Sequence, residues 1–260
     1  MAARVRFGLF CIIVLALPAG LMALDDPRIG DFGKLVMILS PAVAGLALNW
    51  GLGKRDGPIR WRSVGLAALV TLTIAGLALA AALVTGAAGF SGQPRAVPDA
   101  ATLVAGTLLT SVLEELGWAG GGLALALKAF GRRAGVLILG LVWAAWHLIP
   151  TFLKIGLFPE LEAAPPLMLV VFVIACVIYR ELLTRFVERS GTWLGAAAGH
   201  AAPNVLLTGF MALSGLVVLE RPEAWPLFPA PGGVVFAALA LAAVWVLRSK
   251  IGASRPASVG

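Results

Sequence analysis

Long apolar stretches separated by short polar turns dominate the chain. Eight such stretches can be counted, at about 7–24, 32–52, 63–89, 100–127, 134–153, 165–183, 192–217 and 232–247. A helix needs roughly 20 mostly apolar residues to cross a bilayer. The pattern therefore predicts an all-α polytopic membrane protein with about eight transmembrane helices.

The breaks between these stretches are too short to hold a soluble domain, so we expect a single transmembrane domain over residues 1–260. The first stretch follows Arg4 and Arg6 and resembles a signal peptide. Residues 21–26 lack the small-x-small pattern of a cleavage site. We therefore expect this stretch to be retained as a helix.

Composition supports a membrane protein. Hydrophobic residues make up 60% of the chain and charged residues 13%, about half the charged fraction of a soluble domain. The net charge of +7 fits Lys- and Arg-rich cytoplasmic loops, and no nucleic-acid-binding motif accompanies it. Cys11 and Cys176 both lie in apolar stretches without metal-binding spacing, so we expect no disulfide between them.

The distribution of charge between the loops predicts an orientation. If the N-terminus is cytoplasmic and the loops alternate, 15 of the 20 Lys and Arg residues fall inside, Arg180 among them. Of the 13 acidic residues, eight fall outside and three inside. Cytoplasmic loops are rich in Lys and Arg, so both termini are expected in the cytoplasm.

Two acidic residues remain, Glu114 and Glu115, in the middle of the fourth stretch. The only two histidines, His147 and His200, also lie within stretches, and Asn204 follows His200 by one helical turn. An ionisable residue inside a bilayer is costly, which makes each of them a functional candidate.

Depth in the membrane groups these residues. Glu114, His147 and Asn204 each lie 14 or 15 residues from the nearest cytoplasmic charge, which is roughly 20 Å at the rise of a helix. The spacing therefore predicts that these polar side chains lie at one depth in the membrane. A buried Glu–His pair that only holds helices together is the alternative. The set lacks a serine or cysteine paired with histidine, so a carboxylate that activates water is favoured, with imidazole and amide groups as oxyanion donors.

Three short motifs bear these residues, in this order. Glu114–Gly120 resembles EExxxR, the five residues from Trp143 to His147 resemble FxxxH, and the five from His200 to Asn204 match HxxxN. Together they resemble the CPBP family of CAAX proteases and bacteriocin-processing enzymes. The motif-bearing core covers about residues 100–217.

This resemblance implies an intramembrane endopeptidase of the CAAX-protease type that hydrolyses membrane-associated or lipidated peptides and proteins. It implies that Glu114 and His147 activate water, that Glu115 accompanies Glu114, and that His200 and Asn204 stabilise the oxyanion. It also leads us to expect a multi-pass protein of the bacterial plasma membrane that needs no cofactor. No nucleic-acid partner is expected, and no oligomeric state is indicated.

Two departures from the motifs keep other interpretations open. Ala119 occupies the arginine position of the first motif, and Trp143 occupies the phenylalanine position of the second. Loss of the arginine removes a cation that would offset two adjacent carboxylates, which favours a non-catalytic membrane scaffold or bacteriocin-immunity protein. A zinc metalloprotease using the same residues is a further alternative, although the chain has no HExxH.

Overall fold

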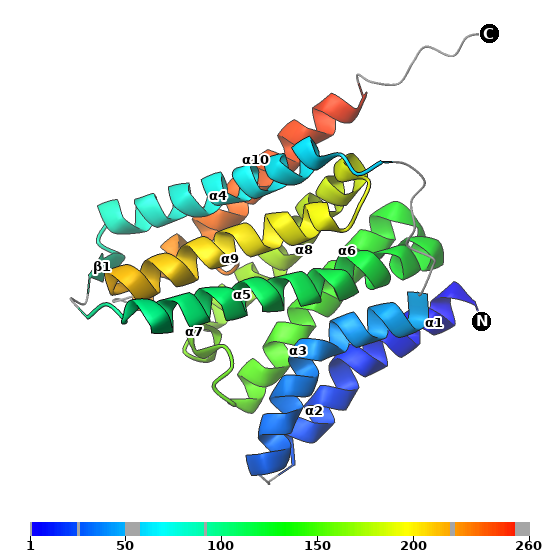
Figure 1. Ribbon diagram of the computed structural model, residues 1–260, viewed down its shortest axis with the longest axis horizontal. Helices are drawn as coiled ribbons and strands as arrows, with labels where there is room; N and C mark the ends of the chain where they lie inside the picture. The colour runs from blue at the N-terminus through cyan, green and yellow to red at the C-terminus, as the bar shows by residue number, and fades with distance from the viewer. Residues whose placement is uncertain (1, 25–26, 50–57, 91–92, 219–221, 253–260) are drawn as a thin grey trace.

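The computed structural model describes residues 2–24, 27–49, 58–90, 93–218 and 222–252, and it consists almost entirely of helices (Figure 1). The all-α prediction is confirmed. The long helices are α1 (Ala3–Cys11), continued through the π-helical turn η1 (Ile12–Ala16) into α2 (Leu17–Met22), then α3 (Pro27–Asn49), α4 (Trp61–Val84), α5 (Val97–Gly117), continued through the π-helical turn η2 (Trp118–Gly122) into α6 (Leu123–Leu153), then α8 (Pro166–Ser190), α9 (Leu194–Ser214) and α10 (Val234–Gly252).

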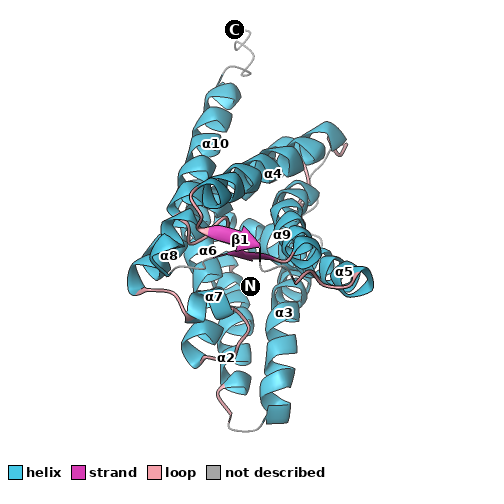
Figure 2. Cartoon of the chain, turned by 90° about the vertical axis from the view of Figure 1, so that its left-hand side faces the viewer, coloured by secondary structure: helices cyan, strands magenta, loops and turns pink. Residues whose placement is uncertain are grey.

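The short elements lie between the long helices. They are α7 (Pro159–Glu162), the 3-10 helix η3 (Pro222–Leu227) and the strands β1 (Ala88–Phe90) and β2 (Leu216–Val218). The two strands pair antiparallel, with Ala88 opposite Val218 (Figure 2). This small ribbon, which the apolar pattern did not predict, joins the end of α4 to the end of α9.

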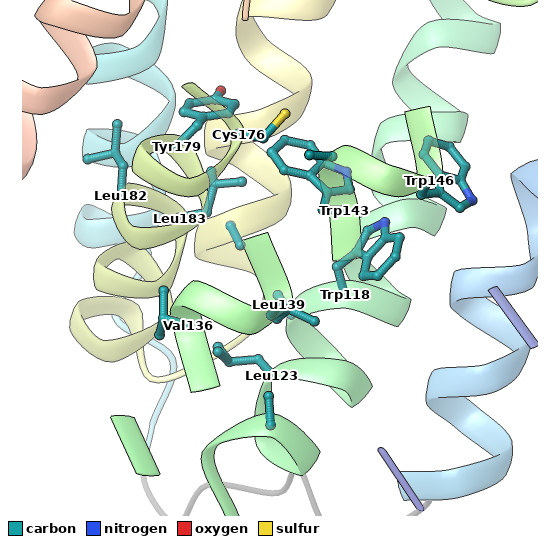
Figure 3. Close-up of a cluster of buried hydrophobic side chains, with 14 of the residues drawn as sticks. Trp118, Leu123, Val136, Leu139, Trp143, Trp146, Cys176, Tyr179, Leu182 and Leu183 are labelled. Atoms are coloured by element: carbon teal, nitrogen blue, oxygen red, sulfur yellow. The ribbon is translucent and has the colours of Figure 1, made fainter. Parts of the chain in front are cut away.

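The helices pack so that the predicted site lies at the centre of the bundle. Helix α9 lies between α4 and α5, while α8 packs against α6 and α10 (Figure 1). A cluster of buried apolar side chains fills the space around α6 and α8, including Leu139, Trp143, Tyr179 and Leu183 (Figure 3). Helices α5, α6, α8 and α9, the motif-bearing part of the chain, thus enclose one core.

Helix α6 is two helical arms joined at Gly131. Its φ of 75° and ψ of 173° are not helical, and a positive φ of this kind is one that glycine adopts at little cost. A Cβ on Gly135 would lie 2.7 Å from the carbonyl oxygen of Ala126, so the arms on either side of the kink are in contact. The chain therefore reverses here, between the predicted stretches 100–127 and 134–153.

Five helical stretches in the described residues are long and apolar enough to cross a membrane. They are Ala3–Met22, Ile29–Asn49, Trp61–Val84, Val97–Leu153 with its kink at Gly131, and Pro166–Ser190, and a shorter apolar helix covers Val234–Arg248. These stretches support an integral multi-pass membrane protein. The count of eight crossings and the cytoplasmic placement of both termini stay predictions.

One predicted boundary is wrong. The apolar stretch predicted to end at residue 183 continues as helix α8 to Ser190, so the expected loop after it is helical. Arg180, which the charge pattern assigned to the cytoplasmic loops, is 1% exposed inside the bundle. The cause is its partner: a buried arginine is stable where a carboxylate neutralises it, as described below.

Helices α3 and α5 approach so closely that their backbones touch. A Cβ on Gly117 would overlap the carbonyl carbon of Pro41, and one on Gly121, in the turn η2 that continues α5, would overlap Cα of Gly45. Small residues permit this close packing between membrane helices. Because Gly117 lies two residues after Glu115 on the same helix, this contact fixes the position of the two glutamates in the bundle.

Gly117→Ala is therefore expected to destabilise the fold by about 3 kcal/mol, since the new methyl group overlaps the backbone of α3. The matched control is Gly106→Ala on the same helix, where a Cβ meets no atom within 4 Å and alanine favours the helix. Thermal unfolding of the purified proteins in detergent measures both. Equal unfolding temperatures for the two variants would show that the α3–α5 contact is not tight.

Candidate active site

A buried ion pair between α5 and α8 lies at the centre of the site. Arg180 Nη1 donates to Glu115 Oε2 at 2.8 Å, and Nη2 donates to Oε1 at 3.0 Å. The side chains are 1% and 0% exposed. Two parallel hydrogen bonds of this kind are the strongest arrangement of arginine and carboxylate. The geometry identifies Glu115 as an ionised carboxylate.

Glu115 also holds His200 of α9. His200 Nδ1 lies 3.0 Å from Glu115 Oε1, and because the carboxylate can only accept, Nδ1 carries the hydrogen. This leaves Nε2 as the ring nitrogen available to another molecule. Both oxygens of Glu115 are thus engaged, so this residue orients its neighbours rather than acting as a free base.

His147 is oriented by its own helix. Its Nδ1 lies 2.9 Å from the carbonyl oxygen of Trp143, one turn earlier in α6, and a carbonyl also only accepts. Nε2 is again the available nitrogen. The two histidines of the chain therefore have the same arrangement, with Nδ1 hydrogen-bonded to the protein and no partner for Nε2 among the described residues.

A cavity of about 210 Å³ opens next to these histidines. His147, His200 and Asn204 line it together with aromatic and other side chains from α6, α8 and the segment after η3, so the structure brings three of the five predicted residues to one surface. Its remaining lining residues are Trp143, Phe158, Glu160, Leu161, Phe172, Cys176, Tyr179, Phe228, Ala230 and Pro231. A mostly apolar cavity with a few convergent polar groups is typical of a ligand site.

Glu114 is not among the residues that line the cavity. It is 7% exposed, and its Oε2 has no hydrogen-bond partner within the described part of the chain. The carboxylate interacts electrostatically with His200, Glu115 and Arg180. Of the two adjacent glutamates, Glu114 is therefore the one with an oxygen that has no hydrogen-bond partner among the described residues.

Asn204 is connected back to α5. Its Nδ2 donates to Ser111 Oγ at 3.2 Å, and an amide NH₂ has a second hydrogen to donate. The predicted one-turn spacing of His200 and Asn204 on α9 is confirmed, since both line the cavity. Ser111 was not predicted, although its position one turn before the glutamates could have identified it.

Trp143 connects the charged and the imidazole groups. The guanidinium carbon of Arg180 lies 4.3 Å from the centre of the Trp143 ring, a cation–π contact. The same indole meets His147 at 5.4 Å and His200 at 5.3 Å between ring centres, both edge to face. The aromatic residue of the second motif is thus in contact with all three cationic or imidazole side chains of the site.

Arg180 is the main residue of the site that the motifs did not predict. The structure places Ala119 in the turn η2, 7% exposed in the apolar core, and brings a cation to the carboxylates from α8 instead. The expectation that the two glutamates lack an arginine is therefore wrong. A signal existed, because Arg180 stands within the apolar stretch predicted over 165–183.

A protein site for zinc needs three or four ligating side chains around one point. In the part of the chain that the structure describes, no group of three or more His, Cys, Asp and Glu side chains comes together in this way. Glu115 is engaged by Arg180, and each histidine keeps one nitrogen available. Hydrogen bonds to protein groups thus orient Glu115 and both histidines.

Comparison with known proteins bears on the same residues. Residues 96–206 match the family model described as type II CAAX prenyl endopeptidase Rce1-like. No curated protein matches the chain. The matched range includes α5, α6 and α8, all five predicted site residues and Arg180. The resemblance to the CPBP family that the three motifs predicted is therefore confirmed over residues 96–206.

Proposed function

We propose that this protein is an intramembrane endopeptidase of the CAAX-protease type that hydrolyses a peptide bond with a water molecule activated by Glu114. One observation carries the proposal: polar groups of the second and third motifs, on α6 and α9, meet at one largely apolar cavity. Of the first motif, Glu115 holds His200, and the adjacent Glu114 keeps a buried oxygen without a hydrogen-bond partner among the described residues. The family match supports this class of activity.

The proposed role of each residue follows from the side-chain atoms that have no hydrogen-bond partner among the described residues. Glu114 takes a proton from water, and the Nε2 lone pair of His147 helps to hold that water. The water oxygen bonds to the scissile carbonyl carbon, whose oxygen becomes an oxyanion. Glu114 then passes the proton to the leaving amine nitrogen as the C–N bond breaks, and the carboxyl product and the amine depart.

Stabilisation of the oxyanion falls to His200 and Asn204. Asn204 keeps one N–H beyond its bond to Ser111, and His200 presents Nε2. A hydrogen on Nε2 in addition to the one on Nδ1 makes the ring an imidazolium, for which ionised Glu115 is the countercharge. Fixed donors aimed at a developing oxyanion usually contribute more to acyl-transfer catalysis than any other single effect.

The cavity supports a membrane-associated substrate. Its walls are mostly apolar and aromatic. Two of the helices that line it, α6 and α8, lie in stretches that are long and apolar enough to span a membrane. Substrates are therefore expected to be membrane-associated or lipidated peptides and proteins, met in the plasma membrane of a bacterial cell.

Glu114→Gln and His147→Ala are expected to abolish cleavage, because both remove a group that contacts the attacking water. Asn204→Ala should retain a measurable rate, about 10²–10³-fold below the original, since one oxyanion donor is lost. A fluorogenic lipidated peptide in liposomes measures the rates. Asp99→Asn is the control, because Asp99 is an exposed acid on the same helix as Glu114. Full activity of the Glu114 or His147 variant would contradict the protease assignment.

Cleavage is expected to persist after treatment with a strong chelator, because the roles above require only side chains and water. The measurement is the rate before and after chelation, together with the metal content of the purified protein. Activity that is lost on chelation and returns with Zn²⁺ would favour the zinc metalloprotease. Absence of cleavage with every lipidated peptide and membrane extract would favour the scaffold or immunity protein.

A further inference from the structure

We propose that Arg180 of α8 takes over the function of the arginine that the first motif lacks, as the positioning residue that keeps Glu115 ionised and, through it, aims His200 Nε2 at the cavity. This inference rests on the proposed function for its effect on cleavage. Its effect on His200 can be measured without cleavage.

Charge balance in the buried cluster requires a cation. Glu114 and Glu115 are adjacent, both are buried, and position 119 carries no charge. The cations that interact with them are Arg180 and His200. With both carboxylates ionised and His200 protonated, the four charges sum to zero only if Arg180 contributes. Without it, the buried cluster carries an uncompensated negative charge, which is strongly unfavourable.

The geometry around Arg180 is specific to an arginine. Arg180 uses both terminal nitrogens on one carboxylate, and its planar guanidinium lies over the Trp143 ring. Tryptophan is the aromatic ring that attracts a cation most strongly, and lysine can supply neither the planar fork nor the stacking. The two departures from the family motifs are therefore linked: the cation has moved from position 119 to α8, and an indole at position 143 supports it there.

Arg180 is 1% exposed and both of its terminal nitrogens are bound to Glu115, so it is not placed to contact a substrate directly. It is absent from the residues that line the cavity, which include His147, His200 and Asn204. Its hydrogen bonds reach the reacting groups through Glu115, which accepts at 3.0 Å from His200 Nδ1. Arg180 should therefore affect the rate of the chemical step and leave substrate binding nearly unchanged.

The rival explanation is that the ion pair between α5 and α8 only stabilises the fold. Four variants distinguish this structural role from the proposed positioning role. Arg180→Met removes the cation, and Arg180→Lys keeps the charge without the fork. The double variant Glu115→Gln with Arg180→Met removes both charges and so relieves the lone buried carboxylate. The fourth variant, Ala119→Arg with Arg180→Met, returns a cation one helical turn from Glu115.

We expect Arg180→Met to lower kcat by about 10²-fold or more, as a misplaced catalytic group does, with little change in KM. Arg180→Lys should recover part of this loss. The double variant should recover thermal stability but not kcat, and the Ala119→Arg variant should recover kcat in part. Unchanged kcat in Arg180→Met, full activity in Arg180→Lys, or recovery of both stability and kcat in the double variant would overturn the proposal.

A spectroscopic measurement separates this inference from the proposed function. The chain has two histidines, so ¹⁵N labelling of histidine gives two sets of ring signals in detergent. Arg180→Met and the double variant should change the His200 signals more than those of His147, because only His200 is hydrogen-bonded to the carboxylate that Arg180 holds. If the original protein cleaves nothing but His200 responds in this way, the proposed function fails and the positioning role stands. If His200 signals are the same in all variants, Arg180 does not position it.

Discussion

The site depends on one constraint: two adjacent carboxylates are held inside a bundle of apolar helices, and charge in such a place needs a countercharge. The cost of moving an ion out of water is several kcal/mol even after relaxation, and an ion pair offsets it only with good geometry. Arg180 and Glu115 provide that geometry with two hydrogen bonds of 2.8 and 3.0 Å. The orientation of His200 follows from this pair, because Glu115 Oε1 serves both the guanidinium and the imidazole.

The pair also gives the two glutamates different environments. Glu115 is fully engaged and acts on its neighbours, whereas Glu114 keeps a buried oxygen without a partner in the described residues. Chemically identical neighbours in the sequence thus occupy different environments, because Glu115 forms ion pairs with side chains of α8 and α9, whereas Glu114 has no such pair among the described residues. The backbone contact of Gly117 with α3 fixes the helix rotation on which this difference depends.

Much of this architecture could be predicted from the sequence because it depends on local patterns. The apolar stretches predict the helices, and the spacing of His200 and Asn204 predicts that they share one face of α9. Polar residues at similar depth give the grouping of His147, His200 and Asn204 at one cavity. These inferences need only the rise and the periodicity of a helix.

The features that the sequence did not predict depend on contacts between helices, and a local sequence pattern carries no information on such contacts. Arg180 looked like a loop residue because a charge commonly ends an apolar stretch, and its burial is explained only by Glu115 on another helix. Ser111 contacts Asn204 across 93 positions of the chain. The aromatic wall of the cavity comes partly from Phe228, far from every motif. Such pairs depend on how helices rotate and pack, which a single sequence leaves undetermined.

Activation of water by Glu114 for peptide cleavage in the membrane is open to a direct test. New protein N-termini are compared in membranes of cells that produce the original chain or Glu114→Gln at equal membrane levels. The proposed mechanism predicts a set of cleavage products, from membrane-associated proteins, that is present with the original chain and absent with the variant. Identical sets of N-termini in the two membranes would contradict it.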